Sequence, residues 1–150
     1  MTGAPHHDQQ GRNADSTPFL APDELVVVLD PDQCWQRLQR SRTARVAFRT
    51  EDSLEVIPVN YAAEARHVLF ATSSAAILAA VEDGREIVLE VDEHDGWTAW
   101  SVVAKGTAQL ADGQHPLAAR LRSMLPTPKR TTVEFEPRTI TGRLFDQAAP

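Results

Sequence analysis

The chain has 150 residues, of which 42% are hydrophobic and 24% charged, which is the size and composition of one ordinary globular domain. Fifteen Lys and Arg against 21 Asp and Glu give a net charge of −6 without a basic stripe, so no nucleic-acid partner is expected. A single cysteine permits no internal disulfide and no apolar run approaches the roughly 20 residues of a membrane helix, so a cytoplasmic location away from membranes is expected.

The two ends of the chain are poor in apolar residues. Residues 1–22 contain only two large apolar side chains, Phe19 and Leu20, and carry no basic segment followed by an apolar one, so no secretory signal is expected. Such a composition does not offset the entropy lost on ordering, which predicts a disordered tail over 1–22. The folded domain is expected over 23–145, with a frayed end at 146–150.

The apolar, β-branched run 25–29 predicts a short strand or docking segment. A helix start follows this run. Asp30 is a good N-cap, Pro31 suits the first helical position, and Gln33 stands where a capping box places Glu or Gln. The helix is expected to end near Arg40. Its buried face is predicted to consist of Cys34, Trp35 and Leu38.

The middle of the chain changes to a period of two, which is typical of strands. Strands are predicted over 45–49, 54–61, 67–72 and 86–92, with a helix over 75–82 before the last of them. Pro58 lies inside the second strand and removes one ladder donor. It therefore marks an edge, a bulge, or a place where another group meets the backbone.

The last third predicts a long strand over 97–110 with a kink at Gly106, and two final strands over 131–136 and 138–145. Between them, His115-Pro116 opens a second amphipathic helix that ends at Pro126. Its apolar face is predicted to carry Leu117, Leu121 and Met124. Six to eight strands leave too many open edges for a small sheet, which favours an antiparallel β-barrel over a doubly wound parallel fold.

Two segments carry candidate binding chemistry. Thr72, Ser73 and Ser74 stand at a helix start, where free N–H groups and hydroxyls suit an anion, or where Ser acts simply as an N-cap. The second segment is the proline-interrupted strand, which exposes backbone groups to a flat heteroaromatic ligand or is an ordinary edge strand. Its residues are Ile57, Pro58, Val59, Asn60 and Tyr61.

A third segment places Trp97 and Trp100 close together, followed by Ser101. These aromatic residues suit the wall of a ring-binding slot, a dimer interface, or the core. No metal site is expected because the histidines lack ligand spacing, and neither a dinucleotide fingerprint nor a nucleophile elbow is present. The catalytic residues stay unknown.

The order of these pieces resembles the pyridoxamine 5′-phosphate oxidase-like proteins, a flavin-binding split-barrel family, and is most similar to its small actinobacterial-type members. The resemblance covers roughly residues 24–145. The segments that carry it are Arg45-Val46-Ala47-Phe48, Pro58-Val59-Asn60-Tyr61, Phe70-Ala71-Thr72, Val88-Leu89-Glu90-Val91-Asp92, Gly96-Trp97, Trp100 to Gly106, and Ile140-Thr141-Gly142-Arg143.

The resemblance implies a six-stranded antiparallel split barrel, a homodimer, and a flavin (FMN) in a cleft at the dimer interface. By analogy, residues 56–61 run along the isoalloxazine ring and residues 72–74 face the ribityl phosphate. Trp97, Trp100 and Ser101 approach the cleft, from the same subunit or its partner. The implied activity is that of an oxidoreductase acting on a small molecule, without implying pyridoxamine phosphate as the substrate.

One position departs from the family pattern. Flavin-binding relatives carry a Lys immediately before the Leu of the small helix, and this chain has Ile77 there. A phosphate without a cationic partner is poorly compensated. Either the helix N–H groups and the three hydroxyls suffice, or Arg45, Arg49 or Arg143 takes the place of the lysine. A deazaflavin or no cofactor is therefore an alternative to FMN, and a cofactor-free dimer acting as a binding or regulatory module is the alternative function. Replacing Ile77 by Lys is expected to tighten FMN binding.

Overall fold

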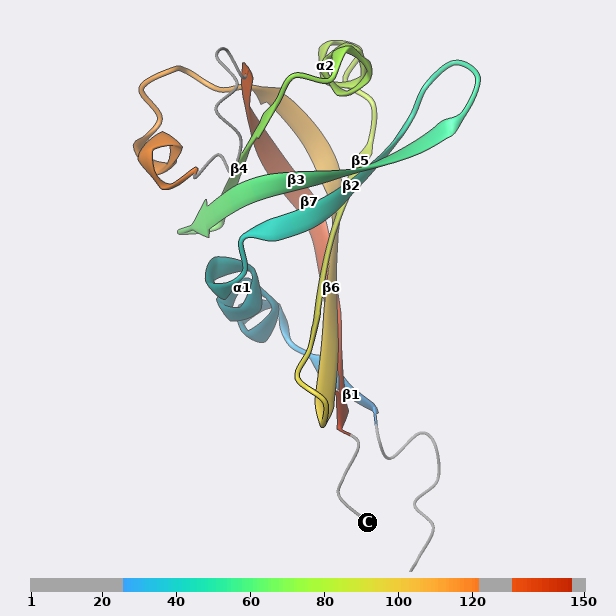
Figure 1. The fold of residues 1–150 in the computed structure, drawn as a ribbon, viewed down its shortest axis with the longest axis vertical. Coiled ribbons are helices and arrows are strands. Elements are labelled where there is room, and N and C mark those ends of the chain that lie inside the picture. The colour runs from blue at the N-terminus through green and yellow to red at the C-terminus, as the bar shows by residue number, and fades with distance from the viewer. Residues whose placement is uncertain (1–25, 122–130, 147–150) are drawn as a thin grey trace, which may run out of the picture.

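The computed structural model describes residues 26–121 and 131–146. Seven strands, two α-helices and one 3₁₀ helix lie in these ranges (Figure 1). In chain order they are β1 (Val26–Leu29), α1 (Pro31–Arg40), β2 (Thr43–Arg49), β3 (Leu54–Glu64), β4 (His67–Thr72), α2 (Ala75–Glu82), β5 (Ile87–His94), β6 (Thr98–Leu110), η2 (Pro116–Arg120) and β7 (Thr131–Asp146).

The strands form one antiparallel sheet that closes on itself. Their order is β1-β7-β4-β3-β2-β5-β6, and β6 also pairs with β7, so six strands make a ring and β1 is added to its outside through β7. This confirms the predicted mainly β, antiparallel barrel. In Figure 1, α2 covers one end of the ring, whereas the turn between β5 and β6 lies at the opposite end of the molecule.

Helix α1 forms as its sequence predicts. The Asp30 carboxylate accepts the Gln33 N–H at 2.8 Å, and the Gln33 side chain accepts the Asp30 N–H at 3.0 Å, which completes the capping box. Cys34, Trp35 and Leu38 are buried, as expected. Burial also raises the pKa of the Cys34 thiol, which suits a small core side chain. Within the described residues, no helix has the length and apolarity needed to cross a bilayer.

Two predictions for the last third are wrong. The two final strands are one 16-residue strand, β7, which continues through Pro137 to Asp146. Pro137 lies opposite Gly106, where the pairing register shifts, so the irregularity that was expected to break the strand is absorbed by a bulge. The predicted second helix is the short 3₁₀ helix η2, in which only Leu117 is buried. Met124 lies outside the described residues, as do the tail 1–22 and residues 147–150.

The predicted kink at Gly106 is confirmed by the same register shift. A Cβ at this position would collide with the backbone oxygen of Glu136 and lie 2.9 Å from the Pro137 Cα. The core that fills the barrel is aromatic and aliphatic. Its largest fully buried side chains are Tyr61, Phe48, Phe70, Phe135, Leu38, Ile77, Ile87 and Leu89.

Candidate functional site

Strands β3 and β4 separate along part of their length, and a cavity of about 400 Å³ lies between them. They pair only from Tyr61 opposite Phe70 to Glu64 opposite His67. Beyond this point β4 turns to β7, where Ala71 pairs with Thr132. The cavity is lined by Thr43, Ile57, Pro58, Val59, Asn60, Ala71, Thr72, Ser73 and Ser74.

The wall formed by β3 presents free backbone groups. The Tyr61 N–H donates to the Arg42 carbonyl at 2.9 Å, which sets the phase of the β2–β3 ladder. Because antiparallel residues alternate in the direction of their backbone groups, Val59 and Ile57 point to β2, and Asn60 and Pro58 point to the cavity. Pro58 therefore sits where its missing N–H removes no ladder bond. Of the three sequence interpretations of Pro58, the structure shows the edge.

The opposite wall is the start of α2. The Thr72 hydroxyl accepts the Ser74 N–H at 3.0 Å, and the Ser74 hydroxyl caps the helix by accepting the Ile77 N–H at 3.4 Å. The next amides, those of Ala75 and Ala76, have no acceptor within a helix of this geometry. Ser73 is exposed and lines the cavity. This end of the cavity therefore combines hydroxyls, N–H groups and the positive end of a helix dipole.

The lining of the cavity contains no ionisable side chain. Of the three arginines considered from the sequence, Arg45 forms ion pairs with Glu90, at 3.1 Å, and with Asp92. Arg49 lies at the other end of β2, opposite Leu54. Arg143 pairs with Ser101 and Val28 at the β1 side of the sheet. None of the three lines the cavity, so an anion there is held by neutral donors.

The position of the missing family lysine does not face this cavity. Ile77 has 0% exposure and packs in the core cluster with residues of the barrel. A Lys at position 77 would have to bury its ammonium group or displace the helix, and an uncompensated buried charge is strongly unfavourable. Ser73, exposed and in the lining, is therefore the position from which an introduced cation can meet a ligand.

The residues at the two ends of the predicted ring-binding segment lie outside the lining. Tyr61 is buried, and its hydroxyl donates to the Leu38 carbonyl at 2.7 Å, so its side chain anchors α1 to the barrel. Burial raises the pKa of Tyr61 far above its ordinary value. Val56 continues the free edge, but its side chain is 57% exposed on the outer face of the sheet.

The third predicted segment is not brought to the cavity of the same chain. Trp97 belongs to the β5–β6 turn and is 64% exposed. Trp100 faces inward, packs against the core, and lies under the guanidinium of Arg37, whose central carbon is 5.7 Å from the ring centre. Ser101 pairs with Asp92 and Arg143. A role of these residues at the cavity therefore requires a second chain.

Two lining residues, Thr43 and Ala71, were not predicted from the sequence. Thr43 lies opposite Asn60 in the β2–β3 register, and Ala71 precedes the hydroxyl segment. Pairing the two predicted strands through their alternation would have placed Thr43 beside Asn60. The departure of β4 toward β7, which brings Ala71 to the wall, has no local signal in the sequence.

Comparison with known proteins supports the architecture described above. Residues 30–144 match the sequence family described as pyridoxamine 5′-phosphate oxidase. No curated protein matches the chain. A candidate pyridoxamine 5′-phosphate oxidase from Corynebacterium glutamicum is 27% identical and superposes with a TM-score of 0.70 over 83% of this chain and 96% of its own.

Two further solved structures share the fold. A conserved protein of unknown function from Corynebacterium diphtheriae is 29% identical, with a TM-score of 0.66 over 81% of this chain and 98% of its own. An FAD-binding protein from Mycobacterium smegmatis is 24% identical, with a TM-score of 0.62 over 80% of this chain and 98% of its own. Since the family match spans most of the folded chain, this protein belongs to the pyridoxamine 5′-phosphate oxidase-like family of split-barrel proteins.

Proposed function

We propose that this protein binds a flavin, FMN in the first instance, between β3 and β4 and acts as a flavin-dependent oxidoreductase on a small molecule. The observation that carries the proposal is the cavity itself. A free backbone edge lies on one wall and a hydroxyl-rich helix start lies on the other. The structural neighbour from M. smegmatis, described as FAD-binding, supports the same class of ligand.

Each wall fits a different part of a flavin. The free N–H and carbonyl groups along 56–60 match the hydrogen-bonding edge of an isoalloxazine ring, and Pro58 and Ile57 provide apolar contact. The hydroxyls of Thr72, Ser73 and Ser74 and the free amides of α2 match a phosphate. A bound flavin supplies hydride transfer, and the chain supplies orientation and hydrogen bonds. Because the lining holds no ionisable group, we assign no acid or base to it.

A second copy of the chain completes the proposed site. The outer face of β3 exposes Leu54 and Val56, and paired residues continue this face across the sheet through Ala47 of β2 and Val88 of β5. A monomer gains nothing from exposing apolar side chains on adjacent strands, whereas a homodimer buries them. Pro58 lies on the same face and lines the cavity, so the partner would cover the open side of the site.

A charge series at Ser73 tests the phosphate end. Ser73→Lys is expected to tighten FMN binding, and Ser73→Glu to weaken it, each by about tenfold or roughly 1.4 kcal/mol. Position 73 is exposed and precedes the N-cap of α2. A carboxylate there interacts favourably with the positive end of the helix dipole, so Ser73→Glu should leave the fold intact. Fluorescence titration with FMN, FAD and a deazaflavin measures the affinities and identifies the preferred ring.

Riboflavin provides the control ligand and Ser53→Glu the control variant, since Ser53 lies in the β2–β3 turn away from the cavity lining. Riboflavin carries no phosphate, so its affinity should not follow the charge at position 73. Equal FMN affinity in the parent chain and in both Ser73 variants would place the phosphate elsewhere. A chain that binds none of the four ligands would refute the oxidoreductase proposal.

The uncharged lining favours one second candidate function. A dimeric split barrel without redox activity, acting as a binding or regulatory module, needs no cation for a phosphate, and this cavity offers none. Such a module would bind a neutral, flat molecule along the β3 edge. Binding of riboflavin with the same affinity as FMN, and no reduction of the bound ring by substrate, would favour it over the oxidoreductase.

A further inference from the structure

Two histidines and a glutamate from three separate parts of the chain meet on the outside of the barrel, away from the flavin cavity. His67 begins β4, Glu134 lies in β7, and His115 immediately precedes η2. One ligand atom from each lies within 4.8 Å of the other two. The Nδ1 of His67 is 2.7 Å from Oε1 of Glu134, and the Nε2 of His115 is 3.7 Å from the same oxygen.

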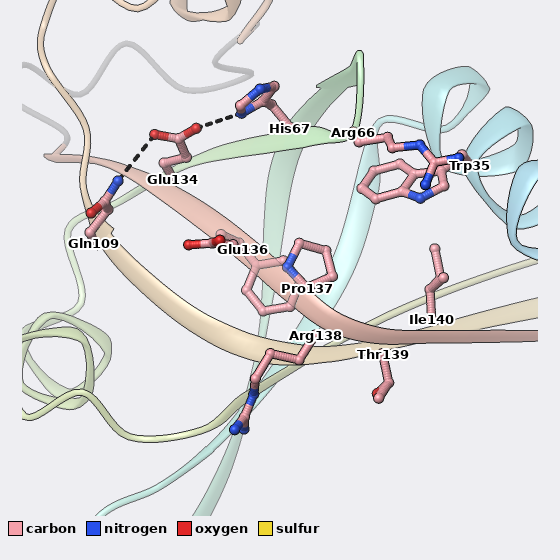
Figure 2. A pocket seen from close by; sticks show the side chains of 11 residues that line it. Trp35, Arg66, His67, Gln109, Glu134, Glu136, Pro137, Arg138, Thr139 and Ile140 are labelled. Carbon is pink, nitrogen blue, oxygen red and sulfur yellow. Dashed lines mark hydrogen bonds and ion pairs between the residues drawn. The ribbon is translucent and has the colours of Figure 1, made fainter.

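Strand pairing explains why these residues converge. Leu69 of β4, Glu134 of β7 and Gln109 of β6 are paired in one row and share a face of the sheet, and His67, two residues before Leu69, lies on that face. The 3₁₀ helix η2 docks on it through Leu117, which packs with Leu69 and Ala62. Docking carries His115 over the Glu134 carboxylate. Figure 2 shows His67 and Gln109 directed at Glu134 from either side.

We propose that His67, His115 and Glu134 bind a divalent transition-metal ion, with Zn²⁺ as the best match. Two imidazole nitrogens and one carboxylate oxygen are the donor types that Zn²⁺ takes in open, three-ligand sites. Ligand atoms around a tetrahedral Zn²⁺ lie about 3.3 Å apart, given bonds of about 2.0–2.1 Å. The distances from Glu134 Oε1 to His67 Nδ1, 2.7 Å, and to His115 Nε2, 3.7 Å, lie on either side of that value.

The surroundings of the cluster suit a cation. The side chains of His115 and Glu134 are only 18% and 20% exposed, so their positions are set by packing. Gln109 lies 3.5 Å from the second carboxylate oxygen, as a residue that orients a ligand would. His67 and Glu134 also line a cavity of about 480 Å³, with room for a water ligand.

Two existing contacts change when the metal binds: the hydrogen bond between His67 and Glu134 gives way to metal bonds, and a contact at the start of η2 is lost. The Leu117 N–H donates to Nδ1 of His115 at 3.2 Å, which places the ring proton of the neutral imidazole on Nε2. Coordination through Nε2 moves that proton to Nδ1, and the Leu117 amide then loses its acceptor. Metal binding therefore has a specific signature at the start of η2, which a metal bound anywhere else would not produce.

Zinc titration of the 150-residue chain tests the proposal, with calorimetry as the readout. His6→Ala and His7→Ala are introduced into every protein so that the N-terminal histidines contribute no binding. We expect one Zn²⁺ per chain. Glu134→Gln and His115→Asn should each weaken binding at least tenfold, roughly the lower limit for losing even an outer-shell partner. His115→Asn keeps an acceptor for the Leu117 amide, so it removes the imidazole without removing the cap.

His94→Ala is the matched control, because His94 ends β5 and stands outside the cluster. It should bind Zn²⁺ like the parent. The NMR signal of the Leu117 amide should move on addition of one equivalent. Absence of saturable binding, unchanged affinity in Glu134→Gln or His115→Asn, or an unmoved Leu117 signal would overturn the proposal. Circular dichroism of the metal-free variants verifies that each is folded, and none of these readouts depends on flavin.

Discussion

Pro58 lies where the barrel opens, and Gly106 lies where it closes. Pro58 lies on the free edge of β3, so the strand continues through it while its backbone stays available to a ligand. Gly106 lies close against the β7 backbone at Glu136 and Pro137, beside the register shift in the β6–β7 pairing that closes the ring. Both were readable from the sequence as irregularities, but only the pairing partners show what each irregularity does.

Gly106→Ala should destabilise the protein by at least about 2 kcal/mol, because the added methyl meets backbone atoms of Glu136 and Pro137 that cannot turn aside. Gly113→Ala is the matched control. A Cβ at Gly113 meets nothing within 4 Å, so the change should stay within about 0.5 kcal/mol. Urea unfolding measures both free energies. Equal stability of the two variants would mean that β6 moves away from β7 without loss.

The candidate site was predictable to the extent that its chemistry is local. Ser and Thr are typical of a helix start, and the three such residues before α2 that line the cavity are Thr72, Ser73 and Ser74. The side chain of Tyr61 points instead to Leu38, because α1 packs over the barrel there, and no local pattern encodes that contact. The prediction that Trp97, Trp100 and Ser101 approach the cofactor stays a prediction that depends on the partner chain.

At the scale of elements, alternation and capping predicted most helices and strands, since both arise from neighbours along the chain. The errors came from long-range pairing. The continuous β7 exists because β6 accompanies it through the bulge, from Thr98 opposite Asp146 to Leu110 opposite Val133. The short η2 reflects how little of its surface the sheet buries, namely Leu117 and part of Ala118.

The outer face of β3, with exposed Leu54 and Val56, is the surface through which we expect the chain to dimerise. Val56→Asp should convert a dimer into a monomer, since it places a charge on the apolar face that we propose the partner covers. Leu110→Asp is the matched control, because Leu110 is 52% exposed but lies at the end of β6. Sedimentation equilibrium measures the mass of each. A monomeric wild-type chain, or a Val56→Asp variant that remains dimeric, would contradict the proposed interface.

In the molecule as a whole, the two candidate sites lie at opposite ends of the short strand β4. Departure of β4 from β3 opens the cavity proposed for the flavin, at the Thr72 end of β4. At the other end, His67 lies beside β7, where it meets Glu134 and His115. The second cluster could not be predicted from spacing, because its three residues are separated by 48 and 19 positions in the sequence (115 − 67 and 134 − 115). Only closure of the barrel brings them together.

Whether the separated edge of β3 holds the flavin ring can be tested by amide hydrogen exchange, measured by NMR with and without saturating FMN. Exchange of the Val56 and Asn60 amides, which point away from β2, should slow when FMN binds. The Val59 amide, which faces β2, should be unaffected and serves as the internal control. Binding of FMN that leaves Val56 and Asn60 unprotected, or protects only residues outside the β3–β4 cavity, would mean that the edge of β3 does not hold the ring.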